Sequence, residues 1–384
     1  MDSCFTLFLK NNIKLLHLFL LVLVLKKEAF SGSVTYMQVM DENGVIDKEL
    51  MPNYVDDNKI LEMLKYMVLA REIDAKALSL QRQGRAVTYA PLLGEEATQV
   101  GAAMALRKDD YFVPNFRQHA VYLVRGLPMD LYFTYWRGYE EAQKIPENVK
   151  GLPVIVPVST QMPHAAGIAY AQKYKETGAA VIAFVGDGGT SEGDFYEAIN
   201  FAGAWNIPLI TIIENNAWAI SEPTRKQTAA TTLAQKGIAA GIKRIIQVDG
   251  NDVIAVYKAV REVIEASADG PAVIEALTYR MGMHTTADDP TKYRPDEELE
   301  RWKPRDPILR VKKYLTAKNL WSEDIEAKFL EENMKKIDDA IEKAESFVPD
   351  PKSMFESVYS FMPAVLQEEM DEAVKENFWQ GDSE

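Results

Sequence analysis

Hydrophobic and polar positions follow two different patterns along this chain. Between Asp57 and Arg82, apolar residues recur at three- and four-residue spacing, as on the buried face of an α-helix. From residue 179 onward, short continuous apolar runs alternate with helical stretches. The runs read AAVIAFV (179–185), PLITIIE (208–214), RIIQV (244–248) and PAVIEALTY (271–279). Such runs are typical of strands that are buried on both faces.

The segments between these runs decide the predicted fold class. Ser191–Asn206 and Asp252–Ala268 both have the pattern of a helix with one apolar side. Strands that alternate with helices predict an α/β fold, with a doubly wound parallel sheet flanked by helices and with helical N- and C-terminal extensions. Ligands of such sheets bind beyond the carboxyl ends of the strands. The candidate ligand-binding loops therefore follow Val185, Glu214, Val248 and Tyr279.

Composition and charge narrow the possible functions. The chain has 384 residues, of which 47% are hydrophobic and 26% charged, as in a globular protein with a large core. Its net charge of −14 disfavours nucleic-acid binding, because phosphate backbones bind to basic surfaces. Cys4 is the only cysteine, so an internal disulfide is impossible and a thiolate zinc site is disfavoured. Histidine chemistry is limited to His17, His119, His164 and His284.

The first 36 residues differ in composition from the rest. Leu15–Leu25 is an apolar run between lysines, and its eleven residues are too few for a bilayer span, which takes about 20. The run could be the core of a signal peptide, although no clear small-residue cleavage site follows. A translation start at Met37 or Met40, or an ordinary structural segment, are the alternatives.

The remainder has the character of a cytoplasmic enzyme, with membrane association through the apolar run as the alternative. The expected domains are a leader at 1–36, a main domain at 37–365 and an acidic tail at 366–384.

Polar side chains follow two of the predicted strands at the point where each strand ends. The AAVIAFV run continues into GDGG (186–189), and the PLITIIE run continues into NN (215–216). One helix links the two strands, so they can be neighbours, and Asp187 and Asn216 can face one crevice. A carboxylate, an amide oxygen and a backbone carbonyl form the oxygen set that Mg²⁺ prefers, completed by ligand phosphates and water. The start of helix 191–206 would offer free N–H groups to a diphosphate.

These two loops also have simpler interpretations. Alone, GDG is most often a simple turn, and NN is a weaker signal still. A dinucleotide-binding GxGxxG loop would need glycine where Ser191 stands, and it would need an acid about 20 residues further on to bind a ribose. The joint pattern of strand, GDG, helix, strand and NN is much more specific than either half.

This joint pattern resembles the thiamine-diphosphate motif of the alpha subunits of pyruvate and branched-chain 2-oxo acid dehydrogenases. The stretch that carries the resemblance is GDGGTSEGDFYEAINFAGAWNIPLITIIENNAWAIS (186–221). Similarity continues in TYAPLLGEEATQVGAA (88–103), FRQHAVYLVRGLP (116–128), TQMPHAAGIAYAQK (160–173), QVDGNDVIAVY (247–257), RMGMHTTADDPTKYR (280–294) and DPILRVKKYLTAKNLWSE (306–323). It covers roughly residues 40–365.

The resemblance implies a reaction, cofactors and partners. The implied protein is an acyl-transferring 2-oxo acid dehydrogenase that uses thiamine diphosphate and Mg²⁺ to decarboxylate pyruvate or a branched-chain 2-oxo acid. The acyl group would pass to the lipoyl domain of the transacylase component. In this family the glutamate that activates the cofactor comes from a beta subunit, so a heterotetramer of two alpha and two beta chains is implied. An acetoin dehydrogenase alpha subunit, or a non-catalytic scaffold of the same fold, remain alternatives.

The resemblance also implies the residues that bind the metal and the diphosphate. Asp187, Asn216 and the backbone oxygen of Trp218 match the Mg²⁺ ligands. The glycines that match the diphosphate-lining positions are Gly186, Gly188 and Gly189.

Further matches concern the rest of the cofactor. Arg117 matches an arginine that contacts diphosphate oxygens, and a guanidinium suits phosphate geometry. His284 matches a histidine near the diphosphate and the mouth of the active centre, which makes it the catalytic candidate. The backbone around Val158 matches the segment that contacts the aminopyrimidine. Phe116 is a departure, because many relatives have tyrosine there, and one hydroxyl contact to phosphate is therefore in doubt.

Overall fold

The computed structural model describes residues 30–350 and 352–376 of the chain. A compact unit begins at Thr35 and contains the helices and strands given below. The domain start expected at residue 37 therefore falls within the first strand. The apolar run Leu15–Leu25 lies outside the described residues. No helix among the described residues combines the length and hydropathy that a bilayer crossing requires.

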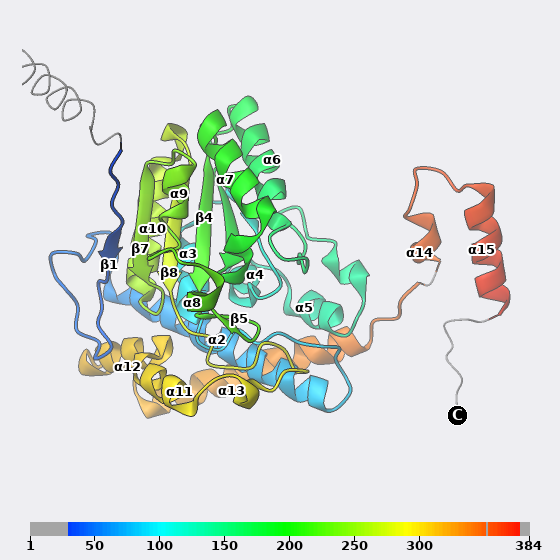
Figure 1. Ribbon diagram of the computed structural model, residues 1–384. Helices are drawn as coiled ribbons and strands as arrows, with labels where there is room; N and C mark the ends of the chain where they lie inside the picture. Colours follow the sequence, from blue (N-terminus) through cyan, green and yellow to red (C-terminus); the bar gives the residue numbers. More distant parts are fainter. Residues whose placement is uncertain (1–29, 351, 377–384) are drawn as a thin grey trace, which may run out of the picture. The chain divides into compact units, whose positions relative to one another are not determined.

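A six-stranded parallel sheet forms the centre of the fold (Figure 1). Its strand order is β1-β7-β8-β4-β3-β2, and every neighbouring pair runs parallel. The strands are β1 (Thr35–Met37), β2 (Tyr111–Val113), β3 (Val181–Gly186), β4 (Leu209–Asn215), β7 (Arg244–Asp249) and β8 (Ala272–Leu277). A separate antiparallel pair consists of β5 (Trp218–Ala219) and β6 (Glu222–Pro223). The predicted doubly wound parallel sheet is confirmed.

The four apolar runs are the four inner strands, whereas the sequence pattern did not predict the two edge strands. β1 and β2 have three residues each, too few to establish a period in the sequence. Both lie before residue 179, where the sequence pattern predicts no strand. Edge pairing of so short a segment depends on the strand that it meets rather than on its own composition.

Helices cover both faces of the sheet (Figure 1). On one face lie α6 (Gln161–Tyr174) and α7 (Gly193–Trp205), and on the other lie α3 (Glu96–Ala105) and α10 (Val253–Glu265). The long helix α2 (Asp57–Arg82) packs against α3 and shares its core, in which Ile60, Leu64 and Met67 are fully buried. The bounds of α2 agree with those predicted from its spacing.

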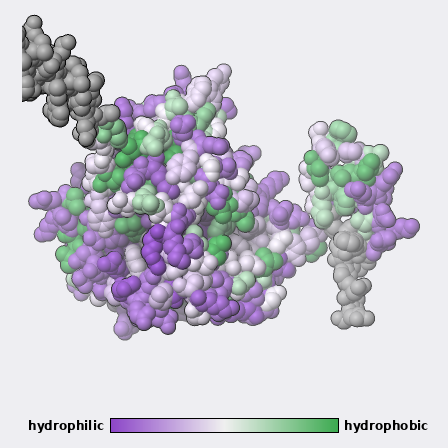
Figure 2. Space-filling model, in the orientation of Figure 1, coloured by the Kyte–Doolittle hydropathy of each residue, from purple (hydrophilic) through white to green (hydrophobic). Residues whose placement is uncertain are grey.

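The other helices in the described residues are α4 (His119–Val124), α5 (Met129–Trp136), α8 (Thr224–Gln227), α9 (Lys236–Ala239), α11 (Asp296–Trp302), α12 (Pro307–Ala317), α13 (Glu323–Glu345), α14 (Ser353–Glu356) and α15 (Ala364–Lys375). Short 3₁₀ turns are η1 (Glu140–Gln143), η2 (Gly188–Ser191), η3 (Ser267–Asp269), η4 (Pro290–Lys292) and η5 (Lys303–Arg305). The tail boundary expected at 366 falls within α15. Hydrophobic residues on the face shown in Figure 2 lie in separate patches among hydrophilic ones, in keeping with the charged composition.

The direction of the connections explains where a ligand can bind. The connections β2-to-β3, β3-to-β4 and β4-to-β7 progress along the sheet in one direction, and β7-to-β8 returns in the other. Right-handed crossovers therefore put α6 and α7 on one face and α10 on the opposite face. Ligands of such sheets usually bind beyond the carboxyl ends of the strands, where these connections begin.

Two helical glycines allow a test of this packing. A Cβ at Gly203 in α7 would lie 1.9 Å from the carbonyl oxygen of Ala240, whereas a Cβ at Gly167 in α6 would have no described atom within 4 Å. We expect Gly203→Ala to lower the free energy of unfolding by about 1–3 kcal/mol through overpacking. Gly167→Ala should raise it by about 0.5–1 kcal/mol, because alanine favours helix. Urea unfolding measures the free energy of unfolding of both variants. Equal changes in the two variants would contradict the close contact at Ala240.

Candidate functional site

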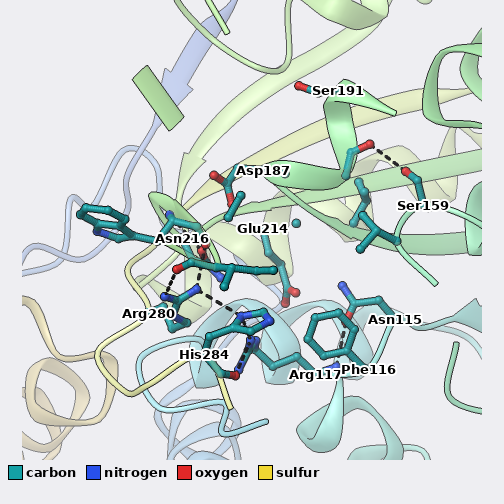
Figure 3. Close-up of a pocket in the computed structure, with 18 of the residues that line it drawn as sticks. Asn115, Phe116, Arg117, Ser159, Asp187, Ser191, Glu214, Asn216, Arg280 and His284 are labelled. Carbon is teal, nitrogen blue, oxygen red and sulfur yellow. Dashed lines mark hydrogen bonds between the residues drawn. The ribbon is translucent and has the colours of Figure 1, made fainter. Parts of the chain in front are cut away.

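A cavity of about 370 Å³ opens at the carboxyl ends of β3 and β4 (Figure 3). Its walls come from the loops after β3, β4 and β8, and from the segments around residues 116 and 159. The site residues named from the sequence all line this cavity: Arg117, Val158, Gly186, Asp187, Gly188, Gly189, Asn216, Trp218 and His284. The fold thus brings together segments far apart in the chain, such as Arg117 and His284, which are 167 positions apart.

Asp187 lies directly after β3, with its side chain almost fully buried at the cavity wall. Its Oδ2 accepts a hydrogen bond of 2.6 Å from the hydroxyl of Thr224. Burial raises the pKa of Asp187, and the hydrogen bond from Thr224 opposes that rise. A cation beside this carboxylate would favour its ionised form, so the position suits an anionic metal ligand.

The β4 end carries two further oxygen atoms. Asn216 donates from its amide nitrogen to Glu95 Oε1 at 2.8 Å, and its Oδ1 accepts from the backbone N–H of Trp218 at 3.3 Å. The carbonyl oxygen of Trp218 accepts from Arg280 Nη1 at 2.9 Å. A carbonyl oxygen has two lone pairs, so one remains available for a cation. Carboxylate, amide and carbonyl oxygens from the segments that follow two adjacent strands therefore suit Mg²⁺.

The glycine segment after β3 has a different conformation from the predicted one. Gly188–Ser191 forms the 3₁₀ turn η2, and α7 begins only at Gly193. The expectation that a helix starting at residue 191 offers its N–H groups is therefore corrected, because the turn η2 stands between β3 and that helix. Lys236 supports η2 from behind, since its ammonium donates to the carbonyl and hydroxyl oxygens of Thr190 at 2.7 and 2.8 Å.

Each glycine of the segment meets a different steric demand. A Cβ at Gly188 would lie 2.7 Å from Ala219 Cβ, and one at Gly189 would lie 2.5 Å from Val185 Cγ2. Close packing of η2 on its neighbours excludes side chains at both positions. Gly186 lines the cavity, and no described atom lies within 4 Å of its hypothetical Cβ. A side chain there would take up space in the cavity itself.

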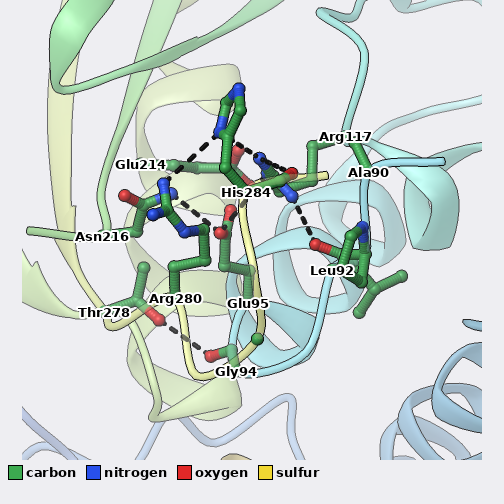
Figure 4. A network of polar contacts seen from close by, with 12 residues as sticks. Ala90, Leu92, Gly94, Glu95, Arg117, Glu214, Asn216, Thr278, Arg280 and His284 are labelled. Carbon is green, nitrogen blue, oxygen red and sulfur yellow. Dashed lines mark hydrogen bonds and ion pairs between the residues drawn. The ribbon is translucent and has the colours of Figure 1, made fainter. Parts of the chain in front are cut away.

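Two arginines hold His284 at the cavity (Figure 4). Its Nδ1 lies 3.2 Å from Arg117 Nη2 and 3.4 Å from Arg280 Nη1. A guanidinium only donates hydrogen bonds, so Nδ1 must accept and Nε2 carries the proton. Burial, together with the positive charges of Arg117 and Arg280, lowers the pKa of His284 to about 3. His284 is therefore a neutral imidazole with one N–H to donate.

Phe116 packs in this group rather than making a polar contact. Its ring meets that of His284 edge to face, with centroids 5.7 Å apart, and the guanidinium of Arg117 lies 5.3 Å from its centre. The ring thus supports two predicted site residues without a hydroxyl.

Buried acids at the cavity floor were not predicted from the sequence. Glu95 and Glu214 line the cavity and are each 1% exposed. Burial raises the pKa of Glu95 to about 6 although Arg117 opposes the rise. Burial and the neighbouring Glu95 raise the pKa of Glu214 well above its usual range, and Gln118 donates a hydrogen bond to it.

Sequence signals for these additional residues differ in strength. Glu214 lies in β4 just before a loop that the sequence singled out, and Arg280 lies in another such loop, after the run that ends at Tyr279. The backbone N–H of Arg280 donates to the carbonyl of Asn216 at 3.2 Å, which brings the two loops together. Glu95 gave no signal, because two glutamates before a helix usually indicate only a charged first turn.

Two histidines left open by the sequence lie outside this cavity. His119 is buried and stacks on Tyr89 with ring centroids 5.1 Å apart, and its Nε2 donates to the carbonyl of Ala90 at 2.7 Å. His164 is exposed on α6 and donates to the carbonyl of Thr160, the N-cap residue of that helix. Each of these two histidine rings therefore bonds a nearby backbone carbonyl and neither lines the cavity.

Comparison with known proteins identifies the family. A family model described as the dehydrogenase E1 component matches residues 64–352. The chain belongs to the dehydrogenase E1 component family. The pyruvate dehydrogenase E1 component subunit alpha of Acholeplasma laidlawii is 43% identical over 340 residues, which are 87% of this chain and 98% of that protein. The subunits of that name from Staphylococcus aureus and Staphylococcus epidermidis are each 42% identical over 340 residues, 87% of this chain and 91% of theirs.

For this member of the E1 family, we expect His284 to stay neutral, with its proton on Nε2, from about pH 8 to about pH 5. Burial and two adjacent guanidinium groups lower its pKa to about 3, so the cationic form is populated only at still lower pH. The unfolded chain takes up this proton near pH 6.5, so the free energy of unfolding should fall as the pH drops below about 6.5.

Nitrogen-15 NMR of histidine-labelled protein measures both the protonation and the tautomer, and His284→Gln assigns the signal. A His284 signal that titrates near pH 6.5 would show that the two guanidinium groups do not act on the ring as described.

Proposed function

We propose that this chain is the alpha subunit of a 2-oxo acid dehydrogenase that acts on pyruvate with thiamine diphosphate and Mg²⁺. The observation that carries the proposal is one cavity in which Asp187 and Asn216 leave adjacent strand ends while Arg117 and His284 face them. Relatives with 42–43% identity are named pyruvate dehydrogenase E1 component subunit alpha, which favours pyruvate over a branched-chain substrate.

The cavity residues fit a magnesium diphosphate. Asp187, Asn216 and the carbonyl of Trp218 would hold the cation, and the space beside Gly186 leaves room for phosphate oxygens. Arg117 would neutralise phosphate charge through hydrogen bonds assisted by its own charge. Lys236 adds a positive charge behind η2, close to the same end of the cavity.

When bound, thiamine diphosphate supplies a nucleophilic ring carbon and a cationic ring that accepts the electron pair left by carbon dioxide. The chain's own residues would orient the cofactor and neutralise its phosphate charge. His284, held neutral, offers the N–H of Nε2 to an anionic oxygen without first losing a proton. Val158 would support the aminopyrimidine at the cavity rim. Orientation of this kind converts bound reactants into near-attack geometry.

A beta subunit would complete the site. Val158 and Ile220 at the cavity rim are 53% and 56% exposed, although both are apolar. Apolar side chains beside a ligand cavity are suited to burial against a partner. We propose two alpha and two beta chains, with the beta chain providing the acid that activates the cofactor. The acyl group would be transferred to the lipoyl domain of the transacylase component. The boundaries of the leader (1–36) and acidic tail (366–384) stay predictions.

Removal of the anionic metal ligand tests the cofactor assignment. In the complex with the beta subunit, Asp187→Ala should weaken Mg²⁺-dependent binding of thiamine diphosphate by more than about 100-fold, because even lost outer-shell partners cost about 10–100-fold. Isothermal titration calorimetry measures the affinity. Asp269→Ala is the control, since Asp269 is an exposed carboxylate of η3. Unchanged affinity in Asp187→Ala would sink the proposal.

Reconstitution tests the reaction and the assembly. We expect no turnover from this chain alone, and decarboxylation with a four-chain mass once the beta subunit is added, because the activating acid is supplied in trans. Steady-state rates with pyruvate, branched-chain 2-oxo acids and acetoin measure specificity, and light scattering measures mass. An active alpha homodimer would overturn the shared site, and preference for acetoin or a branched-chain acid would replace pyruvate.

A further inference from the structure

Glu95 is a buried acid that contacts two of the residues assigned to the cofactor (Figure 4). Its Oε1 accepts from the amide nitrogen of Asn216 at 2.8 Å and lies 3.8 Å from Nε of Arg117. Its side chain is 1% exposed and lines the cavity. One carboxylate thus joins a metal-ligand candidate from the end of β4 to a phosphate-ligand candidate from the segment before α4.

Capping of the adjacent helix does not explain this side chain. Glu95 occupies the N-cap position of α3, but among the described residues its side chain makes no capping hydrogen bond. The neighbouring Glu96 points elsewhere, since its carboxylate pairs with Arg71 at 2.7 Å and accepts from the backbone N–H of Gly94 at 3.0 Å. Two consecutive glutamates therefore have different surroundings, and only Glu95 faces the cavity.

The contact with Asn216 determines which end of the amide faces the cation position. The two ends of an asparagine side chain have nearly the same shape, but only the oxygen can bind a metal ion. An ionised carboxylate can only accept hydrogen bonds, so it selects the NH₂ end of Asn216. The oxygen must then point away from Glu95, and the hydrogen bond to Oδ1 from the N–H of Trp218 selects the same orientation.

The contact with Arg117 is electrostatic. The guanidinium is buried, and its Nη2 is held by the ring nitrogen and carbonyl oxygen of His284 while its Nη1 donates to the carbonyl of Pro91. Those acceptors are neutral. Glu95 adds a negative charge at the Nε side, which offsets the cost of burying this cation before any phosphate arrives.

We propose that Glu95 is a positioning residue that holds the amide oxygen of Asn216 toward the Mg²⁺ position and keeps Arg117 oriented for the diphosphate. The inference rests on the proposed function, because it needs the cation to bind at Asn216. It predicts that the acceptor-only character of residue 95, rather than its bulk, sets the Mg²⁺ requirement of cofactor binding.

Substitution by the isosteric amide tests this directly. In the complex with the beta subunit, Glu95→Gln should raise the half-saturating Mg²⁺ concentration for thiamine diphosphate binding by about 10–100-fold, as loss of an outer-shell partner does. Calorimetry and intrinsic tryptophan fluorescence follow binding without turnover. The matched control is Glu96→Gln, which should lower the thermal unfolding midpoint through loss of the Arg71 pair but leave the Mg²⁺ requirement unchanged.

A donor–acceptor exchange keeps the test decisive even if Glu95→Gln folds poorly. In the double variant Glu95→Gln/Asn216→Asp, the carboxylate moves to position 216, where either oxygen can bind the cation, and the amide of residue 95 donates to the other. We expect its half-saturating Mg²⁺ concentration to return to within about 10-fold of the parent value. Rescue would show that the polarity of this contact, and not a carboxylate at position 95 as such, sets the Mg²⁺ requirement.

The outcomes separate this inference from the proposed function. If Asp187→Ala abolishes Mg²⁺-dependent binding while Glu95→Gln leaves the Mg²⁺ requirement unchanged, Glu95 has no positioning role and the cofactor assignment stands. A double variant that remains as defective as Glu95→Gln would also overturn the inference. If neither Asp187→Ala nor Glu95→Gln alters the Mg²⁺ requirement, both the assignment and the inference fail.

Discussion

β3 and β4 run parallel with Gly186 opposite Glu214, and the rest of the cavity depends on that pairing. Both strands end at the same edge, so Asp187 and Asn216 leave the sheet side by side. A shift of register by one residue would reverse the direction of every side chain on one strand and separate the two oxygens. Fully buried side chains on both strands, such as Phe184 and Ile212, oppose such a shift because it would exchange the sheet face on which each packs.

Charge balance under the cavity is the second constraint, and it follows from the first. The segments that meet at this edge bring Arg117 and Arg280 together with Glu95, all of them buried. Isolated buried charges are costly, whereas hydrogen-bonded and mutually compensated ones are tolerated. Burial of His284 and its two neighbouring cations, Arg117 and Arg280, keep the imidazole neutral, since both disfavour its protonated form. Arg117, Arg280 and His284 thus form a preorganised set of hydrogen-bond donors for an anionic ligand.

The main features of the fold could be predicted because they depend on hydrophobic patterns within single helices and strands. The apolar runs of the four inner strands are continuous and were recognised in all four cases, although β7 is only partly buried over residues 244–247. The edge strand β2 at Tyr111–Val113 could not be recognised, because three residues carry no period and its pairing with β3 is non-local. The start of α7 was predicted two residues early, because the sequence does not show that the glycines adopt a 3₁₀ turn.

The sequence by itself determined the fold class, the GDGG and NN segments at two strand ends, and the family resemblance that assigned roles to Arg117 and His284. Only the tertiary structure decided that Glu95 touches Asn216 and that two arginines set the tautomer of His284. The physical reason is the range of the interactions. Hydrophobic periodicity acts within one element and can be read along the chain. Compensation of a buried charge depends on groups from distant segments, and their identity is known only once the chain is folded.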